Sequence, residues 1–84
     1  MKIFENIINH KISNITADEL LKYGTQFQIS ITKGQANKIA SFLRGKNINI
    51  FNDAERSKLV KEIAKLAGPE TAKQVNQLFI QFSK

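Results

Sequence analysis

The chain has 84 residues, the size of one small domain, and we expect residues 1–84 to form a single domain. Hydrophobic residues at 42% and charged residues at 24% are typical of a globular protein and exclude a disordered chain. The sequence contains no cysteine, which excludes disulfides, thiolate metal sites and cysteine nucleophiles.

No apolar run approaches the roughly 20 residues that span a bilayer. Glu5 also interrupts the beginning of the chain, where a secretory signal needs a continuous apolar segment. We therefore expect a cytoplasmic protein without a membrane partner.

The formal net charge of +6 is unevenly distributed. The N-terminal third of the chain is neutral, whereas no acidic residue lies between Glu19 and Asp53. Clustered cations raise the local concentration of polyanions, so this asymmetry bears on the choice of partner and not on chemistry.

Helix starts are marked at four places along the chain. Three segments have the spacing of an N-cap followed three residues later by a side chain that can reach back. These segments are Thr16–Glu19, Thr32–Gln35 and Asn52–Glu55. Ile15 and Leu20 flank the first of them at the spacing of a hydrophobic staple. Gly68 followed by Pro69 predicts the end of one helix and the start of another.

Between these signals the apolar residues recur with a helical period, which predicts an all-α domain of five short helices packed around Ile, Leu and Phe stripes. The expected helices are 2–11, 17–25, 33–44, 53–67 and 69–82. The stripe of the first helix consists of Ile3, Phe4, Ile7 and Ile8.

Residues 28–31 and 48–51 break this period, because polar and apolar residues alternate there as in a strand. One interpretation is a short β-bridge between the two segments. The other is that both are extended connectors whose isoleucines enter the core.

The sequence offers little material for catalysis. Five of the seven carboxylates fall in predicted first helical turns, where they complement unpaired amides and the helix dipole. His10 is the only histidine, and its neighbours are poor partners for a base or a metal ligand. We expect a protein that is not an enzyme and that has no cofactor or metal.

One constellation has a functional interpretation as a polyanion-binding surface. Lysine and arginine can contact phosphates while asparagine supplies hydrogen bonds. The candidate residues are Lys33, Lys38, Arg44, Lys46 and Asn47. A solvated helix face with excess lysine is the favoured explanation of the same residues. Gly45 is expected just past a helix end, in a left-handed conformation.

The last predicted helix has an almost uncharged polar side, and interface cores are depleted of charge. Gln77, Gln81 and Phe82 are the candidate interface residues there. The sequence favours a small non-enzymatic interaction module that binds an unknown protein partner or forms a homo-oligomer. The alternative is a basic nucleic-acid-binding module that uses the third helix and the following loop.

The run from Leu43 to Asn52 reads Leu-Arg-Gly-Lys-Asn-Ile-Asn-Ile-Phe-Asn. Together with Pro69–Ala72 and Val75–Phe79, it resembles the YqfT-like proteins of Bacillus-type bacteria, a small family of unknown function. The resemblance covers nearly the whole chain. It implies a single-domain cytoplasmic bacterial protein with no assigned activity, cofactor or catalytic residue.

Overall fold

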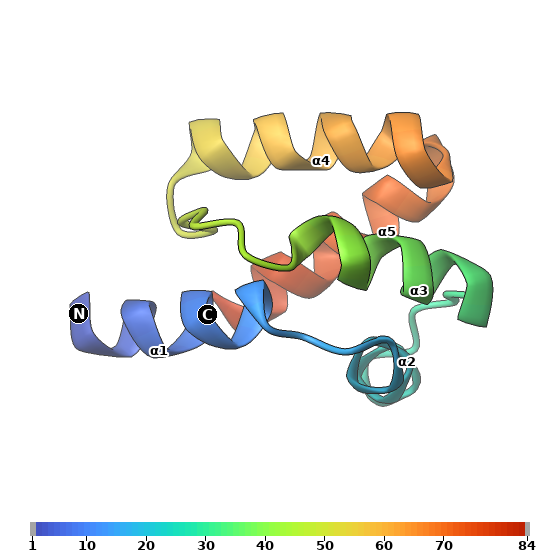
Figure 1. The fold of residues 1–84 in the computed structure, drawn as a ribbon, viewed down its shortest axis with the longest axis horizontal. Helices are drawn as coiled ribbons and strands as arrows, with labels where there is room; N and C mark the ends of the chain where they lie inside the picture. Colours follow the sequence, from blue (N-terminus) through green and yellow to red (C-terminus); the bar gives the residue numbers. More distant parts are fainter. Residues whose placement is uncertain (1, 84) are drawn as a thin grey trace.

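The computed structural model describes residues 2–83 and folds them into five helices (Figure 1). The helices are α1 Lys2–Ser13, α2 Ala17–Gln26, α3 Lys33–Leu43, α4 Asp53–Ala67 and α5 Pro69–Phe82. The prediction of an all-α fold is confirmed, and every predicted helix end lies within two residues of the observed one. None of the helices in this part of the chain is long and apolar enough to cross a membrane.

Two capping boxes fix the starts of α2 and α3. The Thr16 hydroxyl accepts from the Glu19 amide at 3.1 Å, and the Glu19 carboxylate accepts from the Thr16 amide at 3.0 Å. Thr32 and Gln35 make the same pair of contacts at 3.2 and 3.0 Å. Each box satisfies backbone donors that have no partner within the helix, so these two predicted starts are set locally.

The start of α4 differs in one detail from the prediction. Asn52 caps the helix by accepting from the Glu55 amide at 3.0 Å, as expected. The Glu55 carboxylate, however, accepts from the Asn49 amide at 3.3 Å and so reaches further back into the preceding loop. At the other end of α4, Gly68 has a φ of 96° and is followed by Pro69 at the start of α5, as the sequence predicts.

Helices α2–α5 form the body of the molecule. The most extensive packing joins α4 to α5, and α3 packs against both α2 and α4. Figure 1 shows α3 between α2 and α4, with α5 passing behind. The largest fully buried side chains come from every part of the body and from the segments between the helices, namely Ile15, Leu20, Ile39, Leu43, Ile50, Leu59, Ile63, Val75, Leu78 and Phe79.

No β-bridge joins residues 28–31 to residues 48–51 in the described chain, so that interpretation is corrected in favour of extended connectors. The backbone donors are already used elsewhere. The Ile29 amide donates to the Gly24 carbonyl at 2.7 Å, and the Ile50 amide donates to the Asn9 side chain at 3.0 Å. The isoleucines of both segments enter or cover the core, and these are Ile29, Ile31, Ile48 and Ile50.

Helix α1 stands apart from the body. Its first turns extend beyond the other helices at the left of Figure 1, and it packs only weakly against them. Ile12, near its C-terminal end, is buried, and Ile8 is half-buried. The expectation that the whole stripe of this helix faces the core is therefore wrong, because the body does not reach as far as the first two turns.

Candidate functional site

The exposed side of α1 carries three large apolar side chains. Ile3 is 78% exposed, Phe4 55% and Ile7 60%. Among the described residues, Leu66 in α4 is the only other exposed large hydrophobic side chain, at 39%. We call Ile3, Phe4 and Ile7 the α1 apolar face.

Two of the three side chains of the α1 apolar face lie on the side of the helix away from the body. Successive helical residues are rotated by about 100°, which places Ile3 and Ile7 roughly opposite Ile12, the residue that is buried against the body. Phe4 lies only about 40° from half-buried Ile8 on the helix and is exposed because the body does not reach the first two turns. Within residues 2–83, the apolar arc of α1 is therefore wider and longer than the surface that covers it.

Polar contacts, rather than apolar packing alone, attach α1 to the body. The Asn9 side chain donates to the Asn49 side-chain oxygen at 3.0 Å and accepts from the amide of buried Ile50 at 3.0 Å. At the end of the helix, the Gly45 amide donates to the Ser13 carbonyl at 3.1 Å. These contacts hold the C-terminal half of α1 against the body.

Gly45 supplies the geometry of one of these contacts. Its φ is 79°, the left-handed conformation expected for the residue past the end of α3. This turn aims the Gly45 amide at the end of α1. The loop that follows α3, which contains the predicted polyanion-binding residues Lys46 and Asn47, is therefore also a point of attachment for α1.

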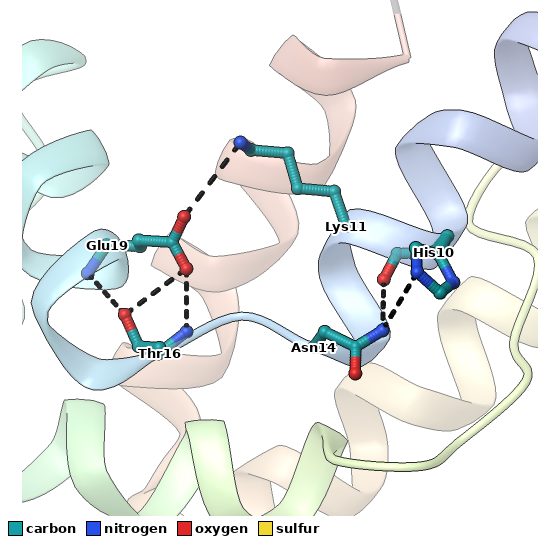
Figure 2. Close-up of polar contacts among 5 residues, drawn as sticks. All are labelled: His10, Lys11, Asn14, Thr16 and Glu19. Carbon is teal, nitrogen blue, oxygen red and sulfur yellow. Dashed lines mark hydrogen bonds and ion pairs between the residues drawn. The ribbon is translucent and has the colours of Figure 1, made fainter.

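A second attachment joins α1 to α2 (Figure 2). The Lys11 ammonium lies 3.9 Å from the Glu19 carboxylate, which also caps α2. The Tyr23 hydroxyl raises the pKa of Lys11, and the charge of Glu19 acts in the same direction. Both side chains of the ion pair are partly exposed, so its contribution to stability is small.

His10 contacts the neighbouring turn of its own helix. It is exposed on α1, and the Asn14 side-chain nitrogen lies 3.5 Å from Nε2 and donates to the His10 carbonyl at 2.9 Å (Figure 2). No group of three metal-ligating side chains occurs within residues 2–83.

A polar hollow of about 370 Å³ lies between α1 and the loop that follows α3. Asn47, one of the predicted polyanion-binding residues, lines it beside Asn6 and His10. Asn9 and Asn49 also line it, but their side chains are engaged in attaching α1. The hollow is therefore a consequence of how α1 is attached.

The predicted polyanion-binding residues do not converge on one point. Lys33 is the first residue of the 11-residue helix α3 and Arg44 follows its last, so the two are separated by about 16 Å along the helix axis. Lys38 borders a shallow hollow whose floor includes Phe42 and Leu66. The Lys46 ammonium lies 4.4 Å from the centre of the Phe42 ring, a cation–π contact. Their role in binding stays a prediction.

The three predicted interface residues of α5 have different surroundings. The Phe82 ring packs edge-on against Tyr23, with centroids 5.0 Å apart, and against Phe27 at 6.3 Å. Gln77 and Gln81 are exposed. Phe82 thus attaches the end of α5 to α2, and the interface at Gln77 and Gln81 stays a prediction.

Sequence reasoning missed the α1 apolar face. The available signal is the width of the apolar arc, because Ile3, Phe4, Ile7, Ile8 and Ile12 together cover about half of the helix circumference. An arc of that width is broader than the stripe of about 100° that is typical of a helix packed against one surface.

Comparison with known proteins gives a family but no activity. Residues 1–83 match the family described as "Protein of unknown function (DUF2624)". The chain is 47% identical over 83 residues to the "Uncharacterized protein YqfT" of Bacillus subtilis (strain 168), and the match covers 99% of each chain. No solved structure matches the chain.

Proposed function

The chain belongs to this family of unknown function, and we propose that it is a small non-enzymatic helical interaction module that binds through the α1 apolar face. The observation that carries the proposal is the exposure of Ile3, Phe4 and Ile7, each more than half open to solvent.

Covering these three side chains provides a driving force for association. A large apolar side chain that becomes fully buried stabilises a complex by about 1.5–3 kcal/mol. Since three such side chains lie side by side on one helix, their burial offsets part of the entropy lost on association. Recognition by one face of a helix with anchors at positions i and i+4 is a common mode of protein binding.

The engagement of the acidic side chains supports a non-enzymatic role. General acid–base catalysis needs carboxylates that can reach a substrate. Glu19 and Glu55 instead accept hydrogen bonds from backbone amides next to helix starts, and Asp53 pairs with Arg56 at 2.9 Å.

Site-specific photo-crosslinking tests the proposal. A photoreactive phenylalanine analogue at Phe4 is expected to give a discrete adduct heavier than the 9.5 kDa chain when the protein is expressed in Bacillus subtilis. The same group at Lys61, an exposed position on α4, is the control and is expected to give none. Absence of an adduct at Phe4, or equal adducts at both positions, would contradict the proposal.

The exposure of Lys33, Lys38 and Arg44 favours nucleic-acid binding as a second candidate function. Fluorescence anisotropy with labelled single-stranded and duplex DNA at about 50 and 200 mM salt tests it, because counterion release makes phosphate contacts salt-dependent. Binding that weakens steeply with salt and is lost in Arg44→Glu/Lys46→Glu would support this candidate. No binding at the lower salt concentration would exclude it.

A further inference from the structure

We propose that the α1 apolar face binds the same face of a second copy of this chain, with the two α1 helices antiparallel. This inference rests on the proposed function and names its partner. It is carried by the distribution of charge, by the order of residues on the face and by the length of helix that extends beyond the body.

The distribution of charge disfavours one of the surfaces through which two copies can approach. No acidic residue lies between Glu19 and Asp53, so two copies that meet through α3 and the loop after it bring together only basic side chains, which is unfavourable. Residues 2–8, which include the α1 apolar face, contain one basic and one acidic residue and have no net charge. This repulsion is therefore absent at the α1 apolar face.

The order of residues on the face is nearly self-complementary. A two-fold symmetric contact places the same patch of both subunits together. In an antiparallel pair centred at residue 5, Ile3 of one copy lies at the level of Ile7 of the other. Phe4 of each copy then lies within one helical turn of this pair of isoleucines. Glu5, at the centre of the pair, points away from the contact, because it is rotated by about 160–200° from Ile7 and Ile3 on the helix.

The part of α1 beyond the body has the length that such a pair needs. Ile8 packs against the core and Asn9 bonds to the loop after α3, so the apolar side chains within residues 3–7 can meet a second helix. The first turns of α1 extend beyond the other helices (Figure 1), so an antiparallel pair of these turns places the two bodies at opposite ends of the pair.

The area involved predicts a weak dimer. The exposed parts of the three side chains amount to an area on the order of 350 Å² per copy, or about 700 Å² for the pair. Stable interfaces bury about 1,200–2,000 Å². We therefore expect a reversible dimer that forms with rising protein concentration rather than a permanent one.

Cysteine crosslinking tests the geometry, because the natural chain contains no cysteine. Equal amounts of Ile3→Cys and Ile7→Cys protein are mixed and oxidised gently. Random pairing would make half of all disulfides join one variant to the other. The antiparallel pair predicts a fraction of mixed disulfides well above one half, since a disulfide needs Cβ atoms about 4 Å apart. Leu66→Cys provides the rate of random collision at an exposed apolar position outside α1.

Three results would overturn the inference. Disulfides in random proportions at the rate of Leu66→Cys exclude a second copy at this face. An excess of disulfides that join two copies of the same variant excludes the antiparallel arrangement. Sedimentation velocity that shows only monomer up to about 1 mM excludes the dimer. If the dimer forms, Ile7→Glu is expected to weaken its affinity by about tenfold or more, and Leu66→Glu is expected to leave it unchanged.

The photo-crosslink at Phe4 separates this inference from the proposed function. An adduct of two identical chains agrees with both. An adduct with a different protein, without dimer or mixed disulfides, leaves the proposed function standing and overturns the inference. The absence of any adduct contradicts both.

Discussion

The body formed by α2–α5 and the helix α1 contain the same apolar residue types, but these residues have different roles in the two regions. In the body, Ile39, Ile63 and Leu78 are fully buried between packed helices. In α1, Ile3 and Ile7 face solvent, and the helix is held by hydrogen bonds of Asn9 and Ser13. The difference shows that an apolar helix face contributes to folding only where the chain supplies a second surface to cover it. Elsewhere it is left for another molecule.

Truncation of a buried isoleucine gives the largest effect in this comparison. Ile63→Ala is expected to lower the free energy of unfolding by about 2–5 kcal/mol, because it leaves a cavity between α4 and its neighbours. Ile7→Ala on the exposed side of α1 is expected to change it by less than about 0.5 kcal/mol. Urea unfolding measures both.

If Ile63→Ala fails to fold, Ile63→Val is expected to cost about 0.5–1.5 kcal/mol and keeps the comparison measurable. Equal losses for the Ile63 and Ile7 variants would show that α1 and the body do not differ in this way.

A pair of glycine substitutions sharpens the description of the body. A Cβ atom at Gly24 in α2 would lie 2.9 Å from the Ile29 carbonyl oxygen, whereas one at Gly34 in α3 meets nothing within 4 Å. Gly24→Ala is therefore expected to destabilise the protein by about 1–3 kcal/mol. Gly34→Ala is expected to stabilise it by about 0.5–1 kcal/mol through helix propensity. Thermal unfolding distinguishes the two signs, and stabilisation by both would contradict the close packing at Gly24.

Removal of the Asn9 side chain weakens the attachment of α1. Asn9→Ala leaves the amide of buried Ile50 without its acceptor, which costs about 1–3 kcal/mol. Hydrogen exchange is expected to accelerate most in α1 and in residues 49–51. Asn6→Ala, at an exposed position on the same helix, is the control and is expected to leave exchange unchanged. Uniform acceleration over all five helices in Asn9→Ala would contradict a local attachment.

The smallest effect concerns the contact of α1 with α2. The Tyr23 hydroxyl raises the pKa of Lys11 above the ordinary value of about 10.5, with a further contribution from Glu19. A raised pKa in the folded state means that the contact contributes below pH 10.5 and loses its contribution as the pH rises through the folded pKa. Tyr23→Phe is expected to lower the pKa of Lys11 toward its ordinary value in an NMR titration. An unchanged pKa in this variant would exclude the hydroxyl as the cause.

The sequence was sufficient to predict the five helices because their signals are local. The capping boxes at Thr16 and Thr32 and the Gly68–Pro69 junction act within a few residues, and the structure has all three. The interpretation of residues 28–31 and 48–51 as a bridge is wrong, because the hydrogen bonding of these segments depends in part on a residue far away in the sequence. Their backbone amides are paired with Gly24 and Asn9, and a long-range partner such as Asn9 has no local signature.

The candidate site was less predictable. The exposure of Lys38 on α3 and of Arg44 just past its end follows from helical periodicity, and both are exposed. Whether such residues converge depends on the turn at Gly45 and on the packing of α3, which periodicity does not encode. The exposure of the α1 apolar face likewise depends on how far the body extends along α1. A helical stripe indicates which residues share a face, but not whether the chain covers that face.

Sedimentation velocity of Ile3→Glu/Ile7→Glu beside the wild-type protein tests the central claim most directly, once urea unfolding has established the stability of both. The account predicts that the wild type associates with rising concentration and that the variant remains monomeric with an unchanged unfolding midpoint. A variant that is strongly destabilised but associates like the wild type would contradict the account, because the α1 apolar face would then serve folding and not binding.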